Sequence, residues 1–438
     1  MSVHGLADSW FRRGLYALVL VGLLARGAVL VPALGRLEDP DNYLPLARAL
    51  AEGRGFLING RPTAYRPPLY PMVLAPLTLA STDQLGRGVA GLHLVLGGAT
   101  VALTALTARR WGLSNGRALA AAAIVACDPV LVVQARAVMT ETLSAFLLAA
   151  TLAALTVDGR LGAALGGMGF GLASLCRPSI LPALILVAGA AFVMGPGGWR
   201  RRARSAVVMV AAAVATMAPW AWRNARVLGE PVWTTTHGGY TLALANNPVY
   251  YAEVLDGPPG AVWSGPNQRR WWDDIGRETS GMTEPRVNRI LLASGARMLV
   301  ERPRDFARAT LARLGRFWGV APSGAVYPAR LRLATALWTV PLWAALVLGS
   351  LRRDHWTWPR ISALLCVAAL TAVHAVFWTD MRMRAPIVPA IALIAVGCGG
   401  ASRDPRNGDG EGPETRGKKT RKITENSQGS AFQIPKRR

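Results

Sequence analysis

The sequence predicts an all-α polytopic membrane protein with about ten transmembrane helices. Of its 438 residues, 52% are hydrophobic and only 17% are charged, against about 25% in an ordinary soluble domain. Several apolar runs approach or exceed the roughly 20 residues that a helix needs to cross a bilayer. The charged residues fall mostly between these runs, as they do in chains that pass repeatedly through a membrane.

Ten apolar runs are candidate spans. They cover residues 14–34, 88–108, 117–134, 138–157, 161–176, 179–195, 205–222, 331–350, 360–378 and 385–400. The first run contains no A-x-A-like cleavage site and is longer than the core of a signal peptide. We therefore expect it to stay as the first helix.

Arginine placement predicts how the spans are oriented, because cytoplasmic connections are enriched in Lys and Arg. Assigned to the cytoplasm are Arg12-Arg13, Arg109-Arg110, Arg160, residues 199–204, residues 352–356 and the basic tail. With ten spans, all of these clusters fall on the cytoplasmic side, and both termini are cytoplasmic. The long polar segments 35–86 and 223–330 then lie on the outer (periplasmic) face of an inner (plasma) membrane, and residues 1–400 form one transmembrane domain.

The net charge of +24 comes almost wholly from arginine. These residues are not clustered on a soluble domain with a binding motif, so the sequence favours membrane lipids and excludes nucleic acid as partners. The chain contains no HExxH, P-loop, GxSxG or Cys/His metal spacing. The segment 401–438 is rich in Gly, Lys, Arg and Asn, which predicts a disordered cytoplasmic tail.

Short interfacial helices are expected in both outer loops. Tyr43, Leu46, Ala47 and Leu50 repeat at helical spacing, before Gly53 and Gly55. The following "YRPPLYPMVLAPLTLA" is too short and too rich in proline to span, so it predicts a second interfacial segment. In the large loop, residues 306–317 also have helical spacing.

Two aspartates and an arginine in the first outer loop are candidates for chemistry. Asp39 and Asp41 precede the first interfacial helix, where one would cap it and the other would be solvated. Either carboxylate is equally suited to act as a general base on a hydroxyl. Arg66 precedes Pro-Pro, and its planar fork suits a phosphate or a carboxylate, with snorkelling to lipid headgroups as the alternative.

Further charged side chains are expected on the same face. Glu141 begins the fourth span, where an acid also complements the helix dipole. Asp128 lies deeper in the third span, which makes it a functional candidate. The other candidates are Arg177, Arg382, Arg384 and, in the large loop, His237.

The order of five motifs over residues 10–400 resembles the bacterial membrane glycosyltransferases of family 39. The motifs are "DPDNYLPLARALAEGRGF", "AYRPPLYP", "MTETL", "PWAWRNARVLGEPVWTTTHGGYTLALANNP" and "RMRAPIVPAIAL". These are GT-C enzymes related to protein O-mannosyltransferases and to the lipid A aminoarabinose transferases. The resemblance implies a GT-C-like fold and a sugar donor linked to polyprenyl phosphate.

The resemblance also implies roles for individual residues. Asp39 stands where the family places its base, with Asp41 as the alternative, and Glu141 matches the second outer-loop acid. Arg66 matches the residue that contacts the lipid phosphate, and Arg382 and Arg384 match a basic pair. The aminoarabinose enzymes carry a metal-associated glutamate where this sequence has Tyr65, so a divalent ion stays open as a cofactor.

The expected activity is therefore hexosyl or pentosyl transfer from a polyprenyl-phosphate-linked donor to a hydroxyl on a protein, lipid or glycan. One base and direct displacement predict inversion at the sugar carbon. A transporter or flippase for a lipid-linked or anionic substrate is the main alternative, but it predicts half-repeats and broken helices that the sequence does not suggest. A non-catalytic assembly subunit would not need acids and arginines gathered on one face.

Overall fold

The structure is a computed structural model that describes residues 3–35, 38–257, 265–322 and 327–398. The described elements are almost entirely helical, and the strands β1 (Leu57–Ile58) and β2 (Arg61–Pro62) pair as a small antiparallel hairpin. The predicted all-α class is confirmed. The predicted tail, 401–438, lies outside the described residues.

Each of the ten predicted runs contains a helix. The helices are α1 (Val3–Leu30), α4 (Thr82–Arg110), α5 (Asn115–Cys127), α7 (Glu141–Ala154), α8 (Gly159–Cys176), α9 (Leu181–Met194), α10 (Trp199–Leu228), α16 (Ala329–Ser350), α17 (Ile361–Val376) and α18 (Val388–Ala395). Within the described residues, α1, α4, α10 and α16 are long and apolar enough to cross a bilayer, and several others are shorter apolar helices. The chain is a multi-pass membrane protein, and the count of ten spans stays a prediction.

Helices α8 and α10 pack closely because α8 presents glycine to its neighbour. A Cβ built on Gly167 would overlap the carbonyl group of Met209, and one on Gly171 would crowd Thr216 of α10. Small residues let helix backbones approach in an apolar environment, where the gain comes from van der Waals contact. The run "LGGMGFG" therefore determines how near α10 can lie.

The run 117–134, predicted as one span, is two helices, and this detail of the prediction is wrong. α5 ends at Cys127 and α6 (Pro129–Gln134) begins after Asp128. The Asp128 carboxylate accepts hydrogen bonds from the backbone N–H groups of Val130 and Leu131, both at 3.0 Å. An N-cap aspartate followed by proline at the first helical position starts a new helix.

The last predicted span also departs from a single α-helix. It is approached by the 3₁₀ segment η6 (Met381–Ile387), and α18 gives way to a second 3₁₀ turn, η7 (Val396–Cys398). η6 packs against α7 and α15, so it carries the charged sequence "DMRMR" into the bundle's end.

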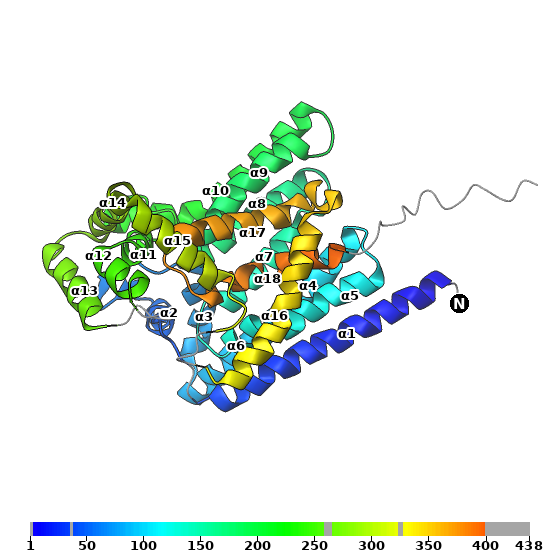
Figure 1. Ribbon diagram of the computed structural model, residues 1–438, viewed down its shortest axis with the longest axis horizontal. Coiled ribbons are helices and arrows are strands. Elements are labelled where there is room, and N and C mark those ends of the chain that lie inside the picture. The colour runs from blue at the N-terminus through cyan, green and yellow to red at the C-terminus, as the bar shows by residue number, and fades with distance from the viewer. Residues whose placement is uncertain (1–2, 36–37, 258–264, 323–326, 399–438) are drawn as a thin grey trace, which may run out of the picture. The chain divides into compact units, whose positions relative to one another are not determined.

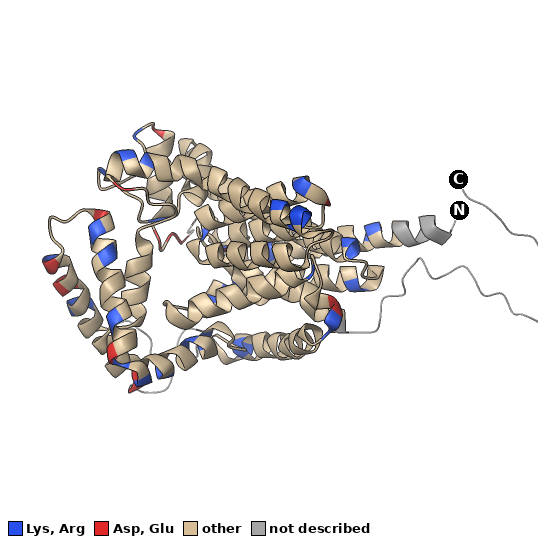
Figure 2. Ribbon diagram, turned by 90° about the horizontal axis from the view of Figure 1, so that it is seen from above, with Lys and Arg blue, Asp and Glu red and all other residues tan. Residues whose placement is uncertain are grey.

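The short helices of the two long polar loops gather at one end of the bundle, on the left of Figure 1, while the N-terminal part of α1 lies to the right. They comprise α2 (Tyr43–Ala51), α3 (Leu69–Leu74), η2 (Ala75–Leu79), α11 (His237–Ala245), α12 (Pro248–Tyr250), η4 (Tyr251–Leu255), α13 (Pro266–Glu278), α14 (Glu284–Glu301) and α15 (Pro303–Phe317). In Figure 2, red and blue segments alternate along the helices at this end, whereas long stretches of the bundle are tan. We call it the loop end.

The predicted helix in the first loop is confirmed as α2. It buries Tyr43, Leu46 and Ala47, as the helical spacing requires. The chain leaves α2 through Gly53 (φ +71°) and Gly55 (φ +90°), a left-handed backbone that glycine adopts without a steric penalty. The predicted second segment forms α3 and η2, which together are short of a membrane span.

Several connections predicted to be cytoplasmic meet at the opposite end of the bundle. The Arg109 guanidinium lies 5.4 Å from the ring of Phe11, which directly precedes Arg12-Arg13. Arg110 Nη1 donates to Thr156 Oγ1 at 3.3 Å, which joins the end of α4 to the turn after α7. The structure thus groups these connections as the arginine pattern predicts.

Candidate functional site

The first long loop lies directly against the connection between α6 and α7. The backbone N–H of Val138 donates to the carbonyl oxygen of Glu38 at 2.8 Å, and Glu38 and Ala137 form an isolated parallel bridge. This contact brings Asp39 and Asp41 to the side of the bundle on which Glu141 starts α7.

Asp39 caps α2. One carboxylate oxygen accepts from the N–H of Tyr43 and the other from the N–H of Leu44, both at 2.8 Å. Burial raises the pKa of Asp39 above its ordinary value, although the two N–H bonds act in the opposite direction. The sequence left two roles open for Asp39, helix capping and general base. In the structure its carboxylate binds the first N–H groups of the helix, as a cap does.

Asp41 pairs with Arg66. Arg66 Nη2 lies 2.9 Å from Asp41 Oδ1, and the side chains keep 16% and 24% of their surface exposed. The guanidinium also lies over the rings of Tyr43 (5.8 Å to the centroid) and Tyr65 (5.3 Å). Two aromatic faces and one carboxylate hold the arginine at a position that solvent still reaches.

A second cluster forms around Glu141, whose side chain is fully buried. Glu141 Oε1 lies 3.1 Å from Arg177 Nη1 and 3.4 Å from Arg382 Nη1. Arg177 also donates to Thr140 Oγ1 at 3.3 Å. Glu141 Oε2 has no hydrogen-bond partner among the described residues. One carboxylate faces two guanidinium groups, so the cluster keeps one positive charge in excess.

Tyr43 lies within electrostatic range of both groups of charges. Burial raises the pKa of Tyr43, and among the charges that act on the phenol are those of Asp41, Arg66 and Glu141. The Asp41–Arg66 pair and the Glu141 cluster therefore belong to one region at the loop end. Its arginines come from three connections that are far apart in the sequence.

The backbone before Arg66 is clamped by residues that the sequence did not single out. Glu284, at the start of α14, accepts from Thr63 Oγ1 (2.6 Å), the N–H of Ala64 (2.8 Å) and Thr236 Oγ1 (2.6 Å). Glu284 opens a helix after Thr283, and that local pattern indicates an ordinary helix start. The sequence therefore held no signal of a contact across more than 200 residues.

Two further contacts hold the same segment. Arg223 Nη1 donates to the carbonyl of Thr63 at 2.8 Å, and its Nη2 donates to the carbonyl of Phe56 at 2.9 Å. Thr235 Oγ1 donates to the carbonyls of Ala64 and Tyr65. Because these contacts fix the backbone directly before it, Arg66 is held in place before any ligand arrives.

His237 and Tyr65 lie beside this arginine. Their rings meet edge to face at 4.5 Å between centroids. Burial lowers the pKa of His237 to about 3, and the charge of Arg66 adds to the effect. The imidazole is therefore neutral at neutral pH, and its Nδ1 has no hydrogen-bond partner in the described part of the chain.

Arg384 and Asp128 are placed apart from these charges. Arg384 is buried, donates to the carbonyls of Gly319 (2.6 Å) and Phe317 (3.3 Å), and lies 4.8 Å from the ring of Trp343. Asp128 caps α6. Both side chains use their polar atoms on the backbone of the fold.

A protein-held metal ion does not fit the described residues. No three His, Cys, Asp or Glu side chains among them come close enough to form a ligand set. The position before Arg66 is Tyr65, and its phenol is a poor ligand for a hard cation while burial raises its pKa.

One family model matches part of the chain. Residues 82–193 match the family described as dolichyl-phosphate-mannose-protein mannosyltransferase. This segment contains Glu141 and Arg177 and runs from α4 to α9. No curated protein matches the chain in sequence.

Solved structures with a similar fold include the oligosaccharyltransferase AglB from Archaeoglobus fulgidus, in complex with an inhibitory peptide and a dolichol-phosphate. The match has 16% identity and a TM-score of 0.52, and it covers 89% of this chain and 50% of that one. This chain spans about half the length of AglB. ArnT from Cupriavidus metallidurans bound to undecaprenyl phosphate has 16% identity, 89% and 77% coverage, and a TM-score of only 0.36. The likeness to AglB confirms the GT-C fold that the sequence resemblance implied.

Proposed function

We propose that this protein transfers a sugar from a polyprenyl-phosphate-linked donor to a hydroxyl acceptor, at the outer face of the inner membrane and with inversion. The observation that carries the proposal is the gathering of Asp41, Arg66, Glu141, Arg177 and Arg382 at the loop end. The GT-C fold and the partial match to a mannosyltransferase family support it.

The arginines supply what a departing lipid phosphate requires. Arg66 is partly exposed to solvent. Arg177 and Arg382 together outnumber the single carboxylate of Glu141, so that cluster has a net positive charge. Guanidinium groups bind phosphate through paired, charge-assisted hydrogen bonds. Because these groups are already ordered, they stabilise the charge that develops on the leaving group without further reorganisation.

The base is assigned to Asp41. Both oxygens of Asp39 accept helix N–H groups, whereas Asp41 uses one oxygen on Arg66. Asp41 takes the proton of the acceptor hydroxyl while that oxygen forms a bond to the anomeric carbon. The bond from this carbon to the phosphate oxygen breaks, and the polyprenyl phosphate leaves with the electron pair. Attack from the face opposite the leaving group inverts the carbon.

A pair of variants tests both the activity and the base. The purified protein in lipid nanodiscs is mixed with a polyprenyl-phosphate-linked radiolabelled sugar and with host membranes as the source of acceptor. Asp41→Asn should lower label transfer by about 100-fold or more, since a general base contributes about 10²–10⁴-fold. Asp39→Asn keeps the size of the side chain and one oxygen that can accept from the N–H groups of α2, but it is not a base, so it should retain transfer within a few-fold.

The outcomes separate the alternatives. Loss of transfer in Asp39→Asn with full transfer in Asp41→Asn would move the base to Asp39. Label that crosses sealed vesicles without entering any covalent product would instead support the flippase. Donor binding that persists in both variants shows that the fold is intact.

A further inference from the structure

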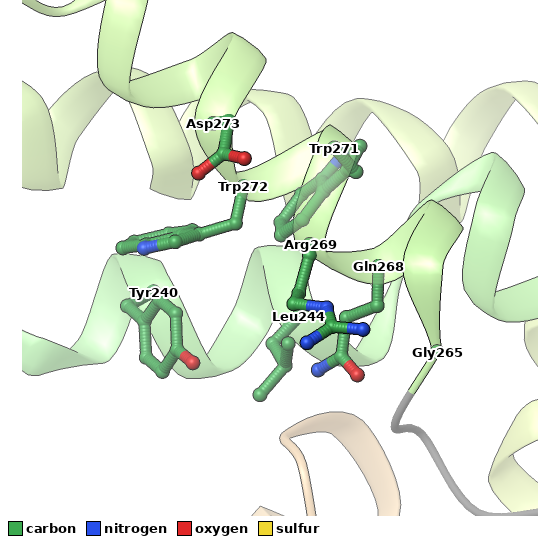
Figure 3. A pocket seen from close by; sticks show the side chains of 8 residues that line it. All are labelled: Tyr240, Leu244, Gly265, Gln268, Arg269, Trp271, Trp272 and Asp273. Atoms are coloured by element: carbon green, nitrogen blue, oxygen red, sulfur yellow. The ribbon is translucent and has the colours of Figure 1, made fainter.

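The large outer loop contains a hollow that the proposed chemistry does not use. It has a volume of about 430 Å³ and lies between α11 and α13. Figure 3 shows Trp272 of α13 above Tyr240 of α11, with Arg269 and Gln268 pointing into the space beside Leu244. Asp273 completes the polar part of the wall.

The wall combines aromatic faces with hydrogen-bonding groups. Trp272 and Tyr240 meet at 4.5 Å between ring centroids, and Trp272 keeps 40% of its surface exposed. Neither Arg269 nor Asp273 forms an ion pair within the described residues, so a guanidinium and a carboxylate are available to a ligand. A lipid tail would leave these groups desolvated without partners.

Carbohydrate matches this mixture. One face of a pyranose ring presents C–H groups, which pack against the electron-rich face of Trp or Tyr. Its hydroxyl groups both donate and accept, and they pair with a carboxylate, a guanidinium and an amide at fixed positions. Binding sites of this kind join an apolar wall to a few placed polar groups.

The hollow is connected to the proposed catalytic region. The Tyr240 ring contacts Tyr65 at 6.1 Å and His237 at 5.0 Å, and Arg66 lies over Tyr65. On its other side, a second hollow continues past Trp272 along Gly276, Arg277 and Ser280. A ligand of several sugar rings could therefore extend along α13 and reach Tyr65 at one end.

We infer that this hollow is an acceptor subsite that binds a sugar ring of a glycan, so that the hydroxyl acceptor is a carbohydrate. That the bound sugar is the acceptor rests on the proposed function, whereas the binding of a glycan in this hollow does not. Figure 1 places α13 among the outermost elements of the loop end, away from the bundle helices where a lipid-linked donor must sit.

Binding is tested without transfer. Wild-type protein in nanodiscs is screened at up to millimolar concentration against tagged oligosaccharides built from hexoses, pentoses and N-acetylhexosamines. At least one should bind, and Trp272→Ala should weaken that binding by 10-fold or more. Trp272→Phe should recover part of it, because an aromatic face remains. Trp199→Ala removes another exposed tryptophan, outside the hollow, and should bind as wild type does.

A second variant and a second probe keep the test decisive. Arg269→Ala, which leaves both rings in place, should also weaken glycan binding, and the polyprenyl-phosphate-linked radiolabelled sugar should bind both variants with unchanged affinity. Binding of that sugar-linked donor that weakens in step with glycan binding would assign the sugar to the donor and overturn the acceptor subsite. So would a screen in which no oligosaccharide binds, or in which peptides bind instead.

The outcomes for the two proposals differ. Glycan binding that depends on Trp272 in a protein with no transferase activity would leave this site standing and refute the proposed function. Transfer that requires Asp41 but is indifferent to Trp272 and Arg269, at every acceptor concentration, would refute the site alone.

Discussion

Arg382 and Arg384 lie two residues apart in η6, yet their guanidinium groups have different surroundings. Arg382 is partly exposed and faces Glu141, whereas Arg384 is buried against two carbonyl oxygens and the ring of Trp343. The first is placed to meet a ligand. The second ties η6 to the end of α15.

These surroundings predict opposite effects of truncation. Arg384→Ala removes the donor to a buried carbonyl, that of Phe317, and to the part-buried carbonyl of Gly319. An unsatisfied buried carbonyl costs about 1–3 kcal/mol, so this variant should clearly lower the thermal midpoint in detergent. Arg382→Ala should leave that midpoint nearly unchanged and weaken undecaprenyl phosphate binding by roughly 10-fold, as loss of a charge-assisted hydrogen bond does. Equal effects of the two variants on stability would contradict this division.

His237 predicts a pH dependence of stability. Burial lowers its pKa to about 3, below the ordinary value of about 6.5, so between these values the unfolded state binds the extra proton. Its contribution to stability is thus present above pH 6.5 and is lost as pH falls towards 3. The slope of the unfolding free energy against pH approaches about 1.4 kcal/mol per pH unit for this group, because unfolding takes up about one proton.

Thermal midpoints across that range give the measurement. His237→Gln cannot be protonated and should flatten the acid limb of the stability curve between pH 6 and pH 4. A curve as steep as that of the wild type would show that His237 does not stay neutral in the folded protein.

Among the helices, the contact of α8 with α10 makes the sharpest prediction. Gly167→Ala places a methyl group against the backbone of Met209, so α10 must move and the folded state should be clearly destabilised. In α9, a Cβ on Gly189 has no neighbouring atom within 4 Å. Gly189→Ala is the matched control and should be neutral or slightly stabilising, through the better helix propensity of alanine.

Local sequence patterns predicted some features of these elements and missed others. The spacing of Tyr43, Leu46 and Ala47 predicted α2 because one buried face produces it. The break at Asp128 had a signal, aspartate followed by proline, but the uninterrupted apolar run around it favoured a single helix. The arginines could be assigned to one face from topology alone. The clamp by Glu284 could not be predicted, because nothing in either local sequence encodes a pairing with Thr63 and Ala64.

At the scale of the whole molecule, the structure separates the charged connections into two ends. One end contains Phe11, Arg109 and Arg110, and the other contains the two long loops. The positive-inside rule, which counts Lys and Arg in short connections, assigns the end with Arg109 and Arg110 to the cytoplasm. The proposed outer location of Asp41 and Arg66 depends on this assignment.

Labelling of single cysteines in intact cells checks the orientation, on a background in which the native cysteines are replaced. A cysteine at Ser280, in the large loop, should react with a membrane-impermeant maleimide. One at Asn115, at the start of α5, should react only after the cells are permeabilised. The reverse pattern would place the site in the cytoplasm.

The clamp on the Arg66 segment has a consequence for how the protein is made. Arg66 lies early in the chain, whereas Arg223, Thr235 and Glu284, which hold its backbone, are synthesised more than 150 residues later. A nascent chain that has inserted its first helices therefore has the arginine without its support. The geometry around Arg66 is completed only when the second long loop has been synthesised and folded, so a partly synthesised chain in the membrane does not yet present the finished form of the proposed phosphate site.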